Sequence, residues 1–214
     1  MSQLVNILSQ VGFFILKSMY KFLLYITFLG IFQCDSTHYA KIQSINNNGV
    51  QTTEGKNIPI SGFGNEQTTV FFIVRHAEKN LEEKDNPNLT EDGKRRANLL
   101  AQLLKNANIQ RIGHTNTKRS VQTAQPLIST LTCGYDVYSS SSIEAYLLNT
   151  IEACRGKSVL VVAHSNTVPT ILNYLVGAEK YKDIPDEEYD NLYVVSVIKN
   201  GNASVEQYKF QENK

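Results

Sequence analysis

Two histidines stand where two strongly apolar segments of the sequence end. Residues 70–74 run directly into Arg75 and His76, and residues 158–163 run into His164. Continuous apolar runs of this length are typical of buried parallel strands, and open α/β sheets bind ligands at the carboxyl ends of their strands. Because imidazole has an ordinary pKa of ~6.5, its neutral form is available as a nucleophile near neutral pH. We therefore expect both histidines at one edge of a sheet, forming a reactive site.

Fixed positive charge accompanies these histidines. Arg75 precedes His76 directly, and Arg119 lies near the start of a predicted helix. Guanidinium groups and helix N-termini both suit phosphate oxygens. His76, His164 and Glu78 also have the ligand types of a metal site, but two arginines would repel a cation. We therefore expect phosphoryl chemistry with no metal ion and no other cofactor.

Four ordered motifs resemble those of the histidine phosphatase superfamily, also called the phosphoglycerate-mutase-like superfamily. They are Arg75-His76, Leu89-Thr90-Glu91-Asp92-Gly93, Arg119 with Gln122-Thr123-Ala124, and Ala163-His164-Ser165-Asn166-Thr167. Together they cover about residues 69–177. Their order and their positions at predicted strand ends and helix starts make the resemblance specific. The compact size is similar to that of the small bacterial phosphohistidine phosphatases in this superfamily.

The resemblance implies a role for each matching residue. His76 corresponds to the nucleophile that forms a phosphohistidine, and His164 to a catalytic partner that also binds the phosphoryl group. Arg75 and Arg119 correspond to the rest of the phosphate pocket, and positioned cations would stabilise a transferring phosphoryl group. Asn166 could hydrogen-bond the phosphate, or it could cap the helix that follows.

The proton donor for the leaving group does not carry over from the superfamily. Related phosphoglycerate mutases use a Glu from a longer middle segment, which this chain lacks, and acid phosphatases use an Asp where this chain has Ser165. An alcohol leaving group needs a general acid. Glu78 is the first candidate, with Asp190 and Glu144 as alternatives, although solvated faces account for such residues equally well. The small phosphohistidine phosphatases lack a dedicated acid, because their leaving group is easily expelled.

The elements that position these residues alternate between strand and helix from Thr69 onward. Thr90 is a good N-cap with two acids after it, and Asn200-Gly201 is a strong hairpin signal. The pattern predicts an α/β fold, a three-layer sandwich whose central, mainly parallel sheet is flanked by helices. We expect strands over 70–74, 111–115, 158–162, 192–198 and 204–210, and helices over 90–104, 120–131, 142–153 and 167–175.

The sequence before this domain differs in composition. Residues 1–34 contain Lys17, Lys21 and no acid, and 22–32 form an uncharged, mostly apolar run. This run is too short to span a membrane alone and resembles a signal-peptide core; an uncleaved anchor is the alternative. Cys34 follows it like the lipidated cysteine of a bacterial lipoprotein.

These features predict three parts and a location. Residues 1–34 would be a signal peptide or membrane anchor, 35–68 a polar linker with room for one hairpin, and 69–214 the catalytic domain. The protein would be exported and periplasmic or associated with the cell envelope, touching a membrane only through its N-terminal segment or a lipid on Cys34.

Composition excludes several other classes. The chain has 214 residues, 21 Lys plus Arg and 20 Asp plus Glu, a net charge of +1 that does not suit a nucleic-acid binder. Three cysteines are too few for a disulfide scaffold. Cys133 and Cys154 could form one bridge or remain two separate thiols. The oligomeric state cannot be predicted.

The residues thus favour an exported enzyme that hydrolyses a small phosphorylated substrate through a phosphohistidine on His76. Two alternatives remain. A phosphohistidine protein phosphatase would have the same pocket but would need a cytoplasmic substrate, whereas a binding module without turnover would have no need of a nucleophile at His76.

Overall fold

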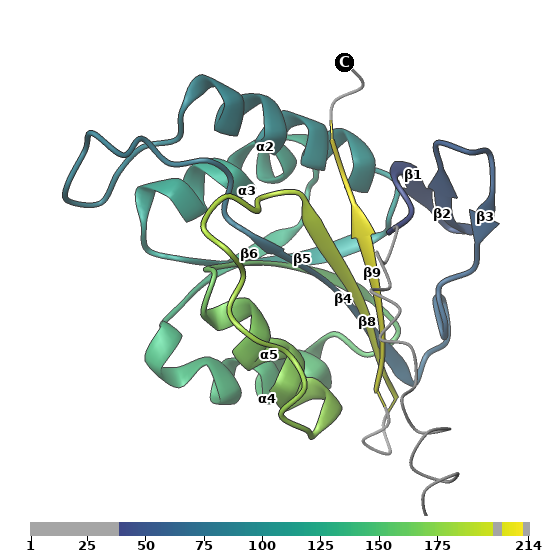
Figure 1. The fold of residues 1–214 in the computed structure, drawn as a ribbon. Coiled ribbons are helices and arrows are strands. Elements are labelled where there is room, and N and C mark those ends of the chain that lie inside the picture. The colour runs from purple at the N-terminus through teal and green to yellow at the C-terminus, as the bar shows by residue number, and fades with distance from the viewer. Residues whose placement is uncertain (1–38, 199–202, 212–214) are drawn as a thin grey trace, which may run out of the picture. The chain divides into compact units, whose positions relative to one another are not determined.

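A six-stranded sheet lies between two pairs of helices in the computed structural model (Figure 1), which describes residues 39–198 and 203–211. The strands are β4 (Thr68–Arg75), β5 (Ile109–Thr115), β6 (Gly134–Tyr138), β7 (Ser158–Ala163), β8 (Asn191–Ile198) and β9 (Ala203–Lys209). The helices are α2 (Glu91–Leu104), α3 (Lys118–Thr130), α4 (Ile143–Ala153) and α5 (Thr167–Val176), with a short 3-10 turn at Ser140–Ser142. Helices α2 and α3 cover one face of the sheet, and α4 and α5 cover the other. This is the predicted three-layer arrangement.

The order of the strands brings the predicted site residues to one edge. The sheet runs β6-β5-β7-β4-β8-β9, and β6, β5, β7 and β4 are all parallel. Strand β4 pairs with β7 so that Arg75 lies opposite Ala163. The carboxyl ends of β4, β7 and β5 therefore meet, and the residues that follow them lie side by side.

The apolar strands are continuous because both of their faces are covered. Along β4, Phe72 and Val74 belong to the core cluster under α2 and α3, and Phe71 and Ile73 to the cluster under α4 and α5. All four side chains are fully buried. Since burying one such side chain stabilises a fold by roughly 1.5–3 kcal/mol, these central strands form a rigid base for the site.

The start of α2 is held against the segment that follows β4. Thr90 caps the helix as predicted, its hydroxyl accepting from the Gly93 amide at 3.1 Å, and its own amide donates to the Glu78 carbonyl at 2.9 Å. A Cβ at Gly93 would lie 2.3 Å from that carbonyl oxygen. Glycine at this position therefore permits the close approach.

The segment predicted as a linker belongs to the folded unit where the structure describes it. From residue 39 it forms a three-stranded antiparallel sheet of β1 (Ile42–Asn46), β2 (Gly49–Thr52) and β3 (Asn57–Ile58). The β1–β2 pair is the hairpin for which the sequence had room. Three of its apolar side chains, Ile42, Ile45 and Val50, are buried in the same core cluster as α2. The sequence did not predict that this segment contributes to the core, because its few apolar residues are scattered among many turn-forming residues.

The C-terminal strands pair as predicted, since β8 and β9 are antiparallel. The turn that joins them, including Asn200-Gly201, lies outside the described residues. Strand β6 was not predicted, because most of its residues are exposed at the sheet edge and show no apolar run.

The predicted leader at 1–34 and the lipid site at Cys34 lie outside the described residues. Among the residues that are described, no helix is long and apolar enough to cross a membrane. Cys133 and Cys154 are free thiols, and they belong to the clusters on opposite faces of the sheet. The proposed bridge between them is therefore not present.

Candidate active site

His76 and His164 lie side by side because β4 and β7 are neighbours. The His76 amide donates to the Ala163 carbonyl at 2.9 Å, continuing the ladder one residue beyond β4. The two imidazole rings meet edge to face, with centroids 5.3 Å apart and planes inclined at 66°. The strand positions in the sequence predict this meeting.

One hydrogen bond sets the tautomer of His76. Its Nδ1 lies 2.8 Å from the Ala77 carbonyl oxygen, which can only accept, so Nδ1 carries the proton. Nε2 therefore keeps a lone pair, and it accepts a hydrogen bond from Arg119 Nε at 3.0 Å. Nε2 is the atom that could attack phosphorus.

Burial keeps His76 neutral. It lowers the pKa of His76 to about 3, an effect opposed in part by the Ala77 carbonyl and reinforced by His164, Arg119 and Arg75. Only 3% of the residue is exposed. The nucleophile thus needs no deprotonation step at neutral pH.

Helix α3 delivers Arg119 to the nucleophile. The helix begins at Lys118, two residues earlier than predicted, so Arg119 lies in its first turn. Thr123 fixes this turn, because its hydroxyl accepts from the Ala77 amide at 3.0 Å and donates to the Arg119 carbonyl at 2.7 Å. The backbone beside His76 and the arginine are therefore held by the same side chain.

Arg75 anchors a loop with one end of its guanidinium. Its Nη1 donates to the carbonyls of Pro185, Asp186 and Glu188 at 2.8–3.2 Å. Its Cζ lies 4.1 Å from the centre of the Tyr189 ring. Its Nε is buried and has no partner in the described structure. The outer nitrogens thus hold residues 185–189, and Nε remains for another ligand.

His164 has a similar division between its two nitrogens. Its Nε2 lies 3.0 Å from the Thr115 hydroxyl, whereas its Nδ1 is buried and has no partner in the described structure. Burial, followed by the charges of Arg119, Arg75 and Lys79, lowers the pKa of His164 to about 4.

The unpartnered nitrogens indicate where an anion would bind. Only three buried side-chain nitrogen or oxygen atoms of the described residues lack a hydrogen-bond partner, and two of them are Arg75 Nε and His164 Nδ1. Leaving such a group unpaired costs ~1–3 kcal/mol, a cost that a ligand oxygen would relieve. A phosphoryl group has enough oxygen acceptors for Arg75, Arg119 and His164 together.

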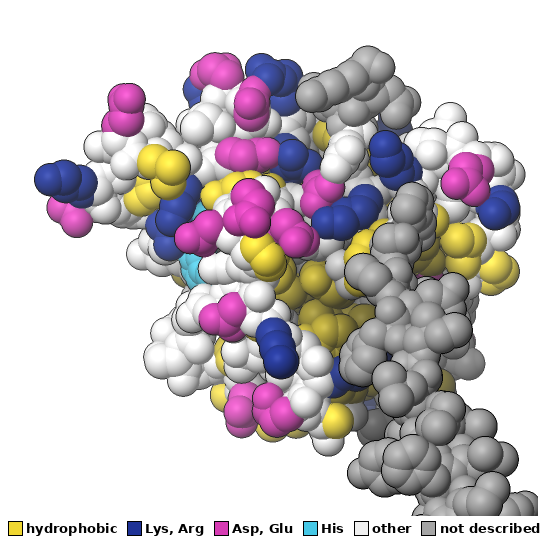
Figure 2. Space-filling model, viewed as in Figure 1, with side chains coloured by type: hydrophobic (Ala, Val, Ile, Leu, Met, Phe, Trp, Pro, Cys, Tyr) yellow, Lys and Arg dark blue, Asp and Glu magenta, His cyan; other side chains and the backbone are white. Residues whose placement is uncertain are grey.

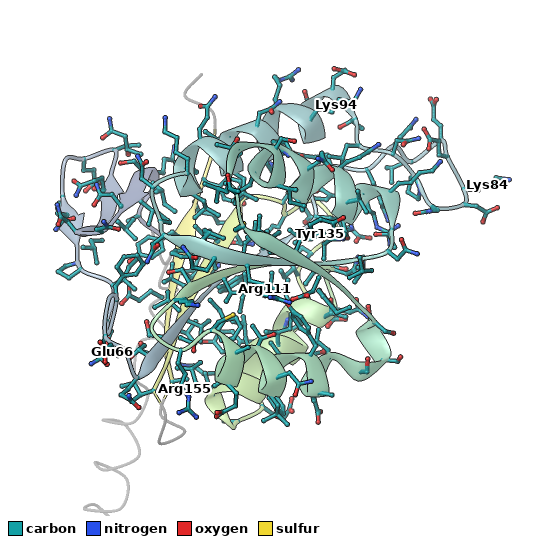
Figure 3. The ribbon with its side chains drawn as sticks, turned by 180° about the vertical axis from the view of Figure 1, so that it is seen from behind. Glu66, Lys84, Lys94, Arg111, Tyr135 and Arg155 are labelled. Carbon is teal, nitrogen blue, oxygen red and sulfur yellow. The ribbon has the colours of Figure 1, made fainter. Side chains whose placement is uncertain are left out.

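The segment from residue 77 to 90 is bound to helix α3. The side chain of Asn86 accepts from the Lys118 amide at 2.9 Å, and that of Gln122 accepts from the Leu89 amide at 2.8 Å. These bonds tie the segment to α3, and they occupy the first amide of the helix, which the sequence suggested as a phosphate donor. Lys84 lies at the outer end of this segment (Figure 3). In Figure 2 the small visible histidine surface lies in a recess between basic and acidic side chains.

The carboxylate of Glu78 is engaged by an arginine. Arg96 of α2 donates to it through Nε at 2.9 and 3.0 Å and through Nη2 at 2.6 Å. Arg96 also donates to the Phe210 carbonyl at 3.0 Å. None of the Glu78 side-chain contacts found among the described residues joins it to His76 or His164. This arrangement favours a structural role for Glu78 over the predicted role of proton donor.

The other two carboxylate candidates also lie in unsuitable surroundings. Burial alone would raise the pKa of Asp190, but bonds from Lys209, at 2.8 Å, and from Gln211 bring the pKa below its usual value. Glu144 is exposed and lines a cavity of about 630 Å³ beside α5. The hydrogen bonds of Asp190 and the exposed position of Glu144 do not favour either residue as the general acid.

Asn166 lies two residues beyond His164, exposed at the start of α5. Its side chain makes no capping bond, so the helix-cap alternative is wrong. Contact between Asn166 and a phosphate stays a prediction.

Sequence reasoning missed Thr115 and Tyr189, and it placed Thr123 in a motif without assigning it a role. Thr123 holds the backbone beside His76, Thr115 holds His164, and Tyr189 lies over Arg75. The rule of strand ends could have found Thr115, since it ends β5 beside β7. Tyr189 comes from an irregular loop and had no comparable signal.

The described residues contain no group of three His, Cys, Asp or Glu side chains placed to hold a metal ion. The catalytic roles of His76 and His164 and the metal independence of the reaction stay predictions.

Comparison with known proteins found a family model that matches part of the chain. Residues 71–139 match the model of the histidine phosphatase superfamily (branch 1), a span that includes His76 and Arg119. No protein of curated function matches the sequence.

Solved structures of phosphatases share the fold. The protein histidine phosphatase SixA complexed with tungstate is 24% identical, covering 65% of this chain and 96% of its own, with a TM-score of 0.54. A phosphoserine phosphatase mutant from Entamoeba histolytica, complexed with phosphoserine, is 15% identical, covering 64% and 94%, with a TM-score of 0.51. A mycobacterial glucosyl-3-phosphoglycerate phosphatase is 11% identical, covering 67% and 100%, with a TM-score of 0.54.

These structural matches establish the fold. The family model also matches the sequence around His76. The resemblance drawn from the sequence is thereby confirmed. The chain thus carries the motifs of the histidine phosphatase superfamily over residues 71–139, and it shares its fold with solved phosphatases.

Proposed function

We propose that this chain hydrolyses small phosphate esters through a phosphohistidine formed on Nε2 of His76, without a metal ion. The observation that carries the proposal is the state of that nitrogen. Its lone pair is free of a proton, and it lies beside Arg75, Arg119 and His164.

The geometry supports a two-step displacement. In the first step, Nε2 of His76 bonds to phosphorus while the ester P–O bond breaks, and the leaving oxygen takes a proton. Arg119 exchanges its bond to Nε2 for one to a phosphoryl oxygen, and Arg75 Nε supplies a second donor. In the second step, water attacks phosphorus, the P–N bond breaks, and inorganic phosphate leaves with His76 restored.

The test is turnover of p-nitrophenyl phosphate by the 214-residue chain in the presence of a chelator, with His76→Ala beside wild type. This substrate has a good leaving group and reports the nucleophile even where protonation is weak. We expect activity that survives the chelator and vanishes in folded His76→Ala. No turnover by folded wild type, or equal turnover by His76→Ala, would contradict the proposal and favour a phosphate-binding module without turnover.

A second candidate is a phosphohistidine protein phosphatase. It is favoured by the contacts of Glu78 and Asp190, because an N-phosphoryl group needs less help from a general acid than an alcohol does. The fold that the chain shares with protein histidine phosphatase SixA is consistent with it. Comparing rates on a histidine-phosphorylated protein and on alkyl phosphates would separate the two candidates.

We also propose that the enzyme acts outside the cytoplasm, because residues 1–34 have the composition of an export signal or anchor. Lipidation of Cys34 would retain it at the cell envelope. Fractionation of cells that produce the wild type and Cys34→Ser tests this: the wild type should partition with membranes and the variant should not. Wild-type protein found in the cytoplasm would instead favour the protein phosphatase.

A further inference from the structure

The leaving group still needs a proton source, and the carboxylates named above do not supply one. Glu78 is paired with Arg96, Asp190 is bound by Lys209, and Glu144 lies exposed beside α5. Among the described side chains around the phosphate pocket, His164 offers an unoccupied ring nitrogen. Its Nδ1 is a buried nitrogen without a partner.

Thr115 determines which nitrogen of His164 is available. The Thr115 hydroxyl, 4% exposed as a residue, donates to Ser120 Oγ at 3.0 Å and lies 3.0 Å from His164 Nε2. A hydroxyl has one proton, so a Thr115 that donates to Ser120 must accept from His164. Nε2 therefore keeps its proton, and Nδ1 is the nitrogen that gains and loses one.

The backbone of His164 is fixed as well. Its amide donates to the Thr167 hydroxyl at 2.8 Å, at the first residue of α5. Strand β5 thus holds one side of the ring through Thr115, and α5 holds the main chain. The imidazole is oriented before any ligand binds.

We propose that His164, positioned by Thr115, is the proton donor to the leaving group. This inference rests on the proposed function and assigns the reaction's acid within the same site.

The charges around His164 explain how it could hold a proton only when it is needed. Arg119, Arg75 and Lys79 act on it, and the neutral ring of His76 faces it. In the empty site these cations and burial oppose a further positive charge. A phosphoryl group brings negative charge that neutralises the cations, so protonated His164 becomes stable once substrate is bound.

The proton balance follows. A phosphate ester monoanion brings one proton, which passes to His164 Nδ1 on binding. As Nε2 of His76 bonds to phosphorus and the ester P–O bond breaks, negative charge moves to the leaving oxygen, which takes the proton from Nδ1. In the second step neutral Nδ1 accepts a proton from the attacking water, and the P–N bond breaks. The phosphate then leaves as a monoanion, and His164 is neutral again.

The experiment compares leaving groups, because a phosphate-binding role and a proton-donating role predict different patterns. We would measure kcat/KM, which reports the first transfer, for 2,4-dinitrophenyl phosphate and for phenyl phosphate. The good leaving group departs without protonation and the poor one does not. The proteins are wild type, His164→Asn, Thr115→Val, Thr115→Ser and Thr150→Val, with His76→Ala as the nucleophile control.

Thr150→Val is the matched control for Thr115→Val. Thr150 is similarly buried, at 5% exposed, and its hydroxyl donates one bond of 2.7 Å to Tyr146 within α4. The substitution removes a buried hydroxyl of the same kind whose hydrogen bond lies within α4 and does not involve His164. It therefore reports the general cost of a lost hydroxyl.

A positioned general acid contributes ~10²–10⁴-fold to turnover, so we expect at least about 100-fold loss on phenyl phosphate in His164→Asn. On dinitrophenyl phosphate, kcat/KM of the same variant should fall by about tenfold or less, because only the binding of the phosphate is weakened. Thr115→Val should show the same pattern at a smaller size, about 10–30-fold on phenyl phosphate. Thr115→Ser should restore the wild-type ratio, and Thr150→Val should keep it.

Two results would overturn the inference. Equal losses on both substrates in His164→Asn would make His164 a phosphate ligand alone. The second result concerns the ratio of kcat/KM on phenyl phosphate to kcat/KM on dinitrophenyl phosphate. If this ratio were as low in wild type as in His164→Asn, no residue would be donating a proton. Failure of the proposed function is distinct, because His76→Ala would then turn over dinitrophenyl phosphate as fast as wild type.

Discussion

The reactivity of His76 follows from one short contact and from its burial. The Ala77 carbonyl places the proton on Nδ1, and burial disfavours the positive charge that protonation of Nε2 would create. Arg119 and Arg75 reinforce this state while they provide donors for the phosphoryl group. The same positive charges therefore protect the nucleophile from protonation and bind the substrate.

This account predicts the titration of His76. Because burial lowers its pKa to about 3, the ring should stay neutral as the pH falls from 7.5 to 5. We would follow the imidazole ¹⁵N signals by NMR and assign them with His76→Asn. A His76 signal that titrates with a midpoint near the ordinary ~6.5 would contradict the account.

Glu78 allows a second prediction at this scale. Because the structure pairs it with Arg96, Glu78→Gln and Arg96→Met should each lower the free energy of unfolding by about 1–2 kcal/mol. Both should leave kcat/KM on phenyl phosphate within about threefold of wild type. A loss of ~100-fold confined to Glu78→Gln would instead show that Glu78 is the general acid. Urea unfolding and steady-state kinetics provide the two readouts.

At the scale of elements, the helices and the fully buried strands could be predicted because their signals are local. The apolar run 70–74 and the cap at Thr90 were sufficient for β4 and α2. Strand β6 could not be predicted, since most of its residues are exposed, and the packing of the β1–β2 hairpin into the core could not be predicted either, since it depends on α2. Tyr189 and the carbonyls around Arg75 belong to an irregular loop, which only the folded chain places.

The junction between α2 and the segment after β4 carries a prediction of its own. Gly93→Ala would place a methyl group 2.3 Å from the Glu78 carbonyl oxygen, so the helix start must move away from that segment. We expect a loss of about 1–3 kcal/mol in unfolding free energy, despite the higher helix propensity of alanine, and a lower kcat. Gln102→Ala, an exposed change in the same helix, should alter neither. A Gly93→Ala variant as stable and active as wild type would show that this contact does not position the site.

For the whole molecule, the buried neutral histidine links folding to pH. The pKa of His76 is lower in the folded state than the ordinary value that it regains on unfolding. Below about pH 6.5 the unfolded chain therefore binds a proton that the folded protein does not, and the free energy of unfolding falls as the pH falls toward the folded pKa. The burial that keeps His76 neutral thus lowers the free energy of unfolding at acid pH.

The corresponding prediction concerns the difference between two proteins. From pH 7 to pH 5, the unfolding free energy of wild type should fall by about 1–2 kcal/mol more than that of His76→Asn, because the variant has no titrating side chain at position 76. Carboxylates contribute equally to both proteins and cancel. Urea unfolding at several pH values measures the difference. Parallel pH dependences would mean that His76 titrates alike in both states.

The phosphorylated enzyme is the most direct test of the central claim that His76 Nε2 accepts the phosphoryl group. The 214-residue chain would be mixed with a dinitrophenyl phosphate substrate, quenched within one turnover under alkaline conditions that preserve phosphohistidine, digested, and analysed by mass spectrometry. We predict one added phosphoryl group on the peptide that contains His76, as the Nε2 isomer, and none in His76→Ala. Substrate turnover with no phosphorylated peptide, or with the phosphoryl group on another residue, would contradict the account.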